Sequence, residues 1–392
     1  MKAIWKIKEK IKPAFSRGGK FEKLHRTFEA FETFLFVPET TTSRGSHIRD
    51  AIDLKRTMIH VIIALMPALL FGMWNVGLQH YRAIGLDVSF WDQFVFGLGK
   101  VLPIIVVSYL VGLGIEFIFA TIRNHEVNEG FLVTGMLIPL IVPPTIPLWM
   151  VALATAFAVL IGKEAFGGTG MNIMNPALLA RAFLFFAYPA YMSGDIWTDT
   201  TLRNGQALID GFSGATPLAH LAAGDISSIP SNLEMFLGTI PGSIGETSTL
   251  AILIGALILI ATGIGSIRIM ASVFFGGLFM GFLFNLIGLN AYMNIPAYQH
   301  LIIGGFAFGA VFMATDPVTA AQTNKGKYIY GFLIGVLAVL IRVINPAYPE
   351  GMMLAILLMN VFAPLIDHYV VESHIKRRKK KAKKTILLNS QV

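Results

Sequence analysis

The chain has 392 residues, of which 55% are hydrophobic and only 14% are charged, with a formal net charge of +8, 30 phenylalanines and no cysteine. This composition cannot belong to one soluble core of this size, so it indicates a membrane protein that crosses the bilayer several times. The lack of cysteine excludes disulfides, cysteine-ligated iron–sulfur clusters and thiol chemistry, so electron transfer through this chain would need an organic cofactor.

The first segment, residues 1–57, mixes polar and aromatic residues and lacks the uninterrupted apolar core of a secretory signal. We expect one or two amphipathic helices at the membrane surface there. It holds thirteen Lys and Arg residues, and the tail at 372–392 holds eight in "KRRKKKAKK". Such basic flanks remain in the cytoplasm, so both termini are predicted there, and no nucleic-acid partner is expected.

Ten apolar segments lie between these flanks, each long enough or nearly long enough to cross a bilayer. The first repeat, 58–191, holds 58–78, 99–121, 130–143, 147–163 and 173–191; the second, 248–371, holds 248–266, 268–290, 299–314, 327–346 and 351–371. The third segment of each set is short and ends in a proline motif, "IVPPTIP" or "MATDPVT", so both third helices should break. The predicted fold is therefore an all-α polytopic membrane protein, with ten transmembrane helices as two inverted five-helix repeats.

The loop at 192–247 follows the fifth span and is predicted to be external. It carries one arginine, Arg203, against six acidic residues, which agrees with that side of the membrane. The loop includes "DGFSGATPLA", in which Ser213, Gly214 and Ala215 leave the backbone uncrowded beside Thr216. A phosphate could therefore sit next to the Thr216 hydroxyl, although a simple tight turn would have the same composition.

Four motifs extend the interpretation. They are "GKEAFGGTGMNIMNPALLARAFLFFAYPA" at 162–190, "SGATPLA" at 213–219, "GGFAFGAVFMATDPVTA" at 304–320 and "FAPLIDHYVVE" at 362–372. Together they resemble the NqrB membrane subunits of the bacterial sodium-translocating NADH:quinone oxidoreductases. The related RnfD subunit of the Rnf complex shares the threonine motif and the ten-span plan, but it lacks the long N-terminal extension present here.

The resemblance implies a translocase subunit in the bacterial inner membrane, surrounded by lipid and by the other subunits of the complex. It implies FMN attached to Thr216 through a phosphoester by an external flavin transferase, and a non-covalent riboflavin between the spans. Electrons would pass from partner subunits through both flavins to quinone while Na⁺ crosses. NADH would bind elsewhere, and we assign no catalytic side chain and no metal centre to this chain.

Several polar residues inside the spans are candidates for these cofactors and for Na⁺. Glu116 and Asp367 match acidic positions that the family associates with ion uptake, but each could equally be a capping or interhelical acid. Asn172, Asn175 and Arg181 have the hydrogen-bonding groups for an isoalloxazine ring. The alternative is that these three side chains only hold neighbouring helices together.

The remaining candidates are apolar or small. Phe308 and Phe312 lie one turn apart and could gate an ion path, although packing explains most phenylalanines in such a chain. Gly112 and Gly114 would let a quinone ring approach the backbone, but small residues also allow close helix packing.

Two other functions fit parts of the sequence. One is that of the RnfD subunit, and the other is a non-redox channel or permease for a small solute, because the predicted fold alone does not determine function.

Overall fold

The structure is a computed structural model that describes residues 54–123, 130–194, 196–200, 214–345, 348 and 350–389, together with parts of 11–48. Every regular element in these residues is helical. The predicted all-α fold is therefore confirmed for the part of the chain that is described.

The first half contains two long helices followed by three shorter ones. These are α3 (Leu54–Ile84), α4 (Phe90–Arg123), α5 (Phe131–Leu140), α6 (Leu148–Gly162) and α7 (Pro176–Ala187). The predicted break in the third segment is confirmed, because α5 ends three residues before Pro143 and the chain turns before α6 begins. The loop that follows carries two short helices, α8 (Pro217–Ala222) and α9 (Asn232–Leu237).

The second half begins with a short helix and ends with the longest one. Its elements are α10 (Thr249–Ala261), α11 (Ile267–Ile287), α12 (Gln299–Ile302), α13 (Phe306–Phe308), the π-helix Gly309–Met313, α14 (Asn324–Ile344) and α15 (Met352–Asn389). The third segment is more broken than predicted. Besides the expected end before Pro317, it is interrupted at 303–305, where Gly304 has a φ of 65° that favours glycine.

Six helices are long and apolar enough to cross a membrane: α3, α4, α6 with the turn after it, α11, α14 and α15. The predicted spans 173–191 and 248–266 are shorter than expected, because α7 has 12 residues and α10 has 13. Each is shorter than the roughly 20 residues that a full crossing needs. Within the described residues, the ten predicted segments therefore correspond to six full-length helices, three short helices and one broken segment.

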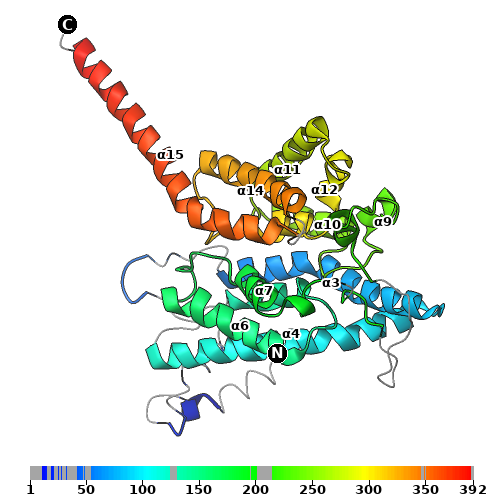
Figure 1. Cartoon of the computed structure of the whole chain (residues 1–392). Coiled ribbons are helices and arrows are strands. Elements are labelled where there is room, and N and C mark those ends of the chain that lie inside the picture. Colours follow the sequence, from blue (N-terminus) through cyan, green and yellow to red (C-terminus); the bar gives the residue numbers. More distant parts are fainter. Residues whose placement is uncertain are drawn as a thin grey trace.

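The two halves pack in the same internal pattern. The second helix packs on the fourth in both halves, as α4 on α6 and α11 on α14, and the fourth packs on the fifth, as α6 on α7 and α14 on α15. Between the halves, first meets first in the α3–α10 pair and fifth meets fifth in the α7–α15 pair. Figure 1 shows the halves as two adjoining layers. These pairings agree with an internal five-helix repeat.

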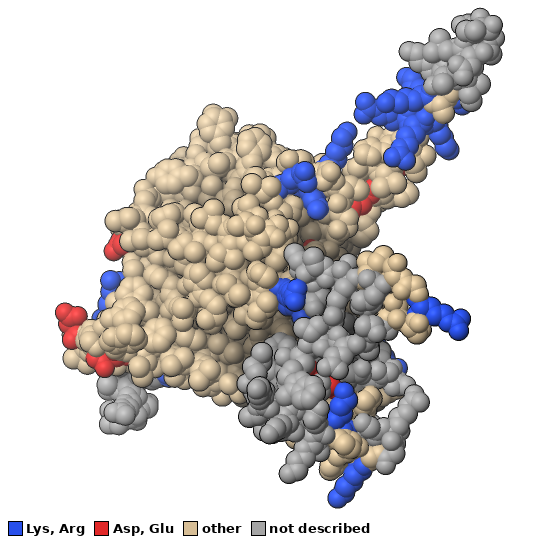
Figure 2. All heavy atoms as spheres, turned by 180° about the vertical axis from the view of Figure 1, so that it is seen from behind, with Lys and Arg blue, Asp and Glu red and all other residues tan. Residues whose placement is uncertain are grey.

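The outer surface follows the division between membrane and water. Large apolar side chains are exposed along α4 and α11, including Leu110 and Phe282. Figure 2 shows a broad face with almost no charged side chain, and a projecting helix end covered by Lys and Arg. This end is the C-terminal part of α15, which extends away from the bundle (Figure 1). An apolar belt with a basic extension is what a bilayer would require.

Glycines set the closest helix contacts. A Cβ on Gly335 of α14 would overlap the backbone of α11 at Val273 and Gly277, so the two helices approach at a distance that only glycine allows. Gly99 of α4 lies in open space instead, with no atom within 4 Å of where its Cβ would be.

We expect Gly335→Ala to lower the melting temperature of the detergent-solubilised protein, because overpacking of this kind costs about 1–3 kcal/mol. Gly99→Ala is the matched control, since it adds the same methyl group to an uncrowded helical site, where Ala is favoured over Gly by up to about 1 kcal/mol. Equal melting temperatures for the two variants would show that α11 and α14 do not pack this closely.

Candidate functional site

Two pockets lie at opposite ends of the helical bundle. We call the end that carries residues 192–247 the loop side, and the end where α15 leaves the bundle the tail side. The loop-side pocket has a volume of about 770 Å³ and the tail-side pocket one of about 840 Å³. Both volumes fall within the range of pockets that hold ligands of cofactor size.

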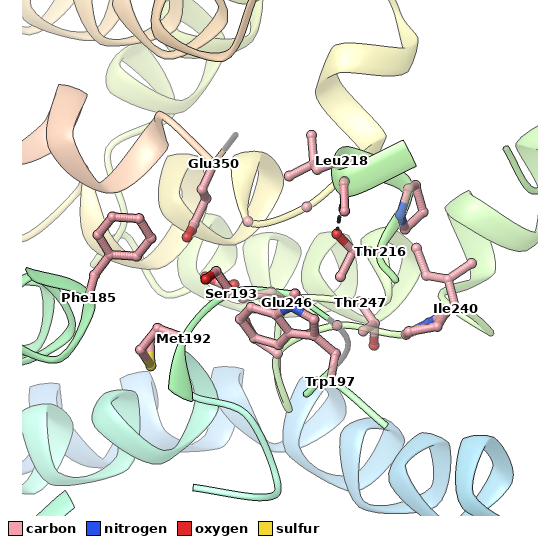
Figure 3. A pocket seen from close by; sticks show the side chains of 18 of the residues that line it. Phe185, Met192, Ser193, Trp197, Thr216, Leu218, Ile240, Glu246, Thr247 and Glu350 are labelled. Atoms are coloured by element: carbon pink, nitrogen blue, oxygen red, sulfur yellow. Dashed lines mark hydrogen bonds between the residues drawn. The ribbon is translucent and has the colours of Figure 1, made fainter. Parts of the chain in front are cut away.

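Thr216 lies on the wall of the loop-side pocket (Figure 3). It is the N-cap of α8, and its Oγ1 accepts a hydrogen bond from the backbone N–H of Ala219 at 3.2 Å. The sequence Thr-Pro produces this geometry, because threonine caps well and proline is favoured at the first helical position. Gly214 is buried and Ala215 half-buried directly before it, whereas Ser213 lies outside the described residues.

The pocket around Thr216 has an aromatic wall and a charged floor. Phe185 and Trp197 contribute rings, and Figure 3 shows both bordering the same space as Glu246 and Glu350. Flat aromatic surfaces beside a few fixed polar groups are typical of sites that bind planar ring systems.

Arg181 is the centre of the charged floor. Its Nη1 lies 2.6 Å from Glu246 Oε1 and its Nη2 lies 2.5 Å from Glu350 Oε2, while Nη2 also donates to Ser243 Oγ at 3.4 Å. The side chains of Arg181 and Glu246 are only 5% and 6% exposed. A second guanidinium, that of Arg342, is fully buried nearby and donates to the backbone carbonyl of Glu350 at 2.6 Å. Charges this deep need such partners.

A second charged pair lies close to Thr216 on α8 and the turn after it. His220 Nδ1 is 3.5 Å from Asp225 Oδ2. Hydrogen bonds from the side chains of Ser227 and Ser228 lower the pKa of Asp225 to about 2, so this carboxylate is ionised at neutral pH. The loop therefore keeps a negative charge a few turns from Thr216.

The tail-side pocket brings together Asn172 and Asn175, as expected for two candidates for one ligand. Asn175 caps α7 through its Oδ1, which accepts from the N–H groups of Ala177 and Leu178, and its Nδ2 donates to Asp316 Oδ2 at 3.1 Å. Arg181 does not join them. It faces the loop-side pocket six residues along α7, so the expected grouping of all three side chains is not what the structure places together.

Glu116 lies on the inner face of α4 and is buried. Its carboxylate forms an ion pair with the ammonium group of Lys163, which is also buried and lies at the end of α6. Asp367 accepts hydrogen bonds from the backbone N–H groups of Gln322 and Thr323 at 2.6 and 2.9 Å, at the start of α14. The structure thus gives each acid a structural contact, and their part in an ion path stays a prediction.

The broken segment of the second half runs from one pocket to the other. Gly305 borders the loop-side pocket, and Phe312 and Asp316 border the tail-side pocket. Phe308 is fully buried between them, and its ring centre is 5.0 Å from that of Phe312. The π-helix lies at this point, and π-helical turns are frequent at functional sites.

Gly112 and Gly114 are two residues apart on α4 and therefore point to different faces. A Cβ on Gly112 would overlap the ring of Phe131, so this glycine serves the packing of α5 on α4. No atom lies within 4 Å of where a Cβ on Gly114 would be. The space for a quinone ring is therefore at Gly114 and not at Gly112, and the quinone site itself stays a prediction.

Sequence reasoning did not assign Lys163, Glu246, Glu350 or Asp316 to any site. All four lie at the ends of apolar segments, where an ionisable residue is a candidate for function. The missing signal is pairing, because the sequence does not tell which charged ends meet.

We expect Arg181→Met to destabilise the protein by about 3–5 kcal/mol, because it leaves two buried carboxylates without their main partner. The double variant Arg181→Met/Glu350→Gln removes one charge of each sign and should recover much of the loss. Melting temperatures in detergent measure both effects. No recovery in the double variant would mean that the packing of the guanidinium, and not its charge, stabilises this region.

Comparison with known proteins agrees with this architecture. Three curated relatives are named as the subunit lettered B of the Na(+)-translocating NADH-quinone reductase. Those of Ectopseudomonas mendocina (strain ymp) and Azotobacter vinelandii are 51% and 50% identical over 94% of this chain and 97% of their own length. That of Chromohalobacter salexigens is 50% identical over 95% of both chains. The NQR2, RnfD, RnfE family matches residues 41–376, and the chain therefore belongs to this family.

Proposed function

We propose that the chain is the NqrB membrane subunit of a sodium-translocating NADH:quinone oxidoreductase and carries two flavins on the route of electrons to quinone. The relatives' names and their coverage of nearly the whole chain support the assignment. The observation that carries the flavin part is the placement of the Thr216 hydroxyl on the wall of a pocket with two aromatic rings and a charged floor.

FMN joined to Thr216 fits the loop-side pocket. The hydroxyl accepts a single backbone hydrogen bond as an N-cap, and a phosphoester oxygen at the same position can keep that bond. Phe185 and Trp197 can flank a planar ring, and Arg181 offers a positive charge at the floor. A bound flavin supplies one- and two-electron chemistry, while these side chains orient it and set the electrostatic potential around it.

Riboflavin fits the tail-side pocket. It is neutral and has no phosphate, so it needs hydrogen-bonding groups more than a cation. Asn172, Asn175 and Thr315 supply such groups, with Phe312 on the apolar side. Arg181 is thus assigned to FMN, and the two asparagines to riboflavin.

The short connection between the pockets suits both electrons and ions. Asn175 and Arg181 border different pockets but are separated by six residues of α7, a rise of about 9 Å. We assign Phe308 and Phe312 to the apolar barrier of the Na⁺ path, since Phe308 is buried between the pockets. Glu116 and Asp367 lie on the tail side, where Na⁺ would enter, and the quinone site is assigned to the surface near Gly114.

The loop side is assigned to the outside of the bacterial inner membrane, and both termini to the cytoplasm. Thr216 is half-buried on the loop, so an external flavin transferase can reach it. The basic end of α15 is on the opposite side of the bundle (Figure 2).

Two alternatives remain distinguishable. The RnfD subunit belongs to the same family, but the relatives described above are named as subunits of the reductase. A permease without redox activity would show no flavin absorbance after purification.

We expect Thr216→Asn to abolish in-gel flavin fluorescence of the denatured chain, because a phosphoester survives unfolding and asparagine has no hydroxyl. Asparagine caps a helix at least as well as threonine, so this variant keeps α8 intact. Thr216→Ala removes both functions and should also cost about 1 kcal/mol in stability.

The controls are Thr216→Ser and Ser213→Ala. Serine keeps hydroxyl and cap, so weak labelling of Thr216→Ser would mean that the transferase recognises the methyl group. Ser213→Ala should stay fluorescent. Persistent fluorescence in Thr216→Asn with loss in Ser213→Ala would place the flavin on Ser213, and fluorescence unchanged in every variant would refute the phosphoester.

We expect a membrane-impermeant maleimide to reach Ser228→Cys from outside and Ala382→Cys only after the cytoplasmic side is opened. Both positions are exposed, one in the loop and one near the end of α15, and the chain has no other cysteine. Labelling of intact cells and of inverted vesicles measures the two accessibilities. The reverse pattern would move Thr216 to the cytoplasmic side.

A further inference from the structure

Two ion pairs hold the end of α4 against the end of α6 on the tail side. Glu116 pairs with Lys163, and Arg123, seven residues further along α4, pairs with Glu164 at 3.2 Å. Arg123 Nη2 also donates to the backbone carbonyl of Glu164 at 3.1 Å. Each helix end therefore contributes one acid and one base.

The two pairs differ in their surroundings. Arg123 is 38% exposed, whereas Lys163 and Glu116 are each 5% exposed. Of these four residues, only Lys163 borders the tail-side pocket, and Asp316 borders the same pocket. The Lys163 ammonium is thus buried with one carboxylate and has a second carboxylate on the wall of the adjoining pocket.

A buried carboxylate in an apolar bundle needs a cation beside it. An ammonium group and Na⁺ carry the same charge, so either of them can neutralise the Glu116 carboxylate. Lysine suits such an exchange, because its ammonium is a compact charge on a flexible four-carbon stem and binds carboxylates without the fixed fork of arginine.

We propose that Lys163 is a tethered competitor of Na⁺ for the Glu116 carboxylate, and that Na⁺ binding turns the Lys163 ammonium into the tail-side pocket towards Asp316. This inference rests on the proposed function, in which Na⁺ enters from the tail side. It adds a coupling step: the displaced ammonium brings positive charge into the pocket assigned to riboflavin, and positive charge there favours the arrival of an electron. Sodium entry and electron transfer would then assist each other.

A purely structural clamp is the competing explanation, and substitutions at Lys163 separate the two. Lys163→Gln removes the competing charge. Lys163→Arg keeps the charge but holds the carboxylate through a bidentate fork, which is harder to displace. Arg123→Gln breaks the second, more exposed pair of the same clamp and is the matched control.

The experiment uses the whole complex at about pH 9, so that Glu116 keeps its charge after its partner is removed. Half-saturation by Na⁺ is read from quinone reduction and, independently, from the rise in melting temperature with Na⁺ in the absence of NADH. We expect about tenfold tighter half-saturation in Lys163→Gln, which corresponds to a pair that is closed about nine-tenths of the time. Lys163→Arg should shift it severalfold in the opposite direction, and Arg123→Gln by less than about twofold.

Unchanged half-saturation in both Lys163 variants would overturn the inference, and so would an equal shift in Arg123→Gln. Lys163→Arg keeps the test decisive if Lys163→Gln fails to fold. A parent complex in which Na⁺ affects neither readout would refute the proposed function itself, independently of Lys163.

Discussion

The buried cluster of Arg181 with Glu246 and Glu350 joins three parts of the chain that are far apart in sequence. Arg181 comes from the last helix of the first half, Glu246 from the end of the loop, and Glu350 from the residues just before α15. In an apolar interior these charges must stay together, because separating them would leave each without water or partner. The floor of the loop-side pocket, and with it the space next to Thr216, depends on this one cluster.

The opposite end of α7 is fixed by weaker but equally specific contacts. Asn175 uses its carbonyl oxygen to cap α7 and its amide to hold Asp316, which follows the broken segment of the second half. The carboxylate of Asp316 also accepts a hydrogen bond from Thr319. The short helix α7 is thus anchored to the second half at its start by Asn175 and further along by Arg181, and each anchor is part of one pocket wall.

Much of the architecture could be predicted because apolar length and proline position are local properties. The helices at 58–78, 99–121 and 268–290 follow from continuous apolar runs, and the end of α5 before Pro143 follows from the loss of a backbone donor. The lengths of α7 and α10 could not be predicted, because a run of apolar residues looks the same when a helix is capped inside it. Asn175 starts α7 within such a run.

The candidate site was predictable in its parts and not in its grouping. Thr216, Asn172 and Asn175 could be selected from the sequence, but only tertiary packing shows that Arg181 belongs with the first and not with the other two. Likewise, the spacing of Gly112 and Gly114 does not reveal that Phe131 fills the space beside the first of them.

The shortness of α7 has an electrical consequence. A bilayer core is about 30 Å thick, but the two pockets are separated by only six residues of α7, or about 9 Å. Where pockets are filled with water, the transmembrane voltage falls mainly across the dry material between them. A monovalent ion crossing that interval would then exchange about 2.3 kcal/mol with each 100 mV of voltage within two turns of helix. The strength of the local field is therefore set by the length of α7, and side chains in this interval would respond to voltage more strongly than any others in the bundle.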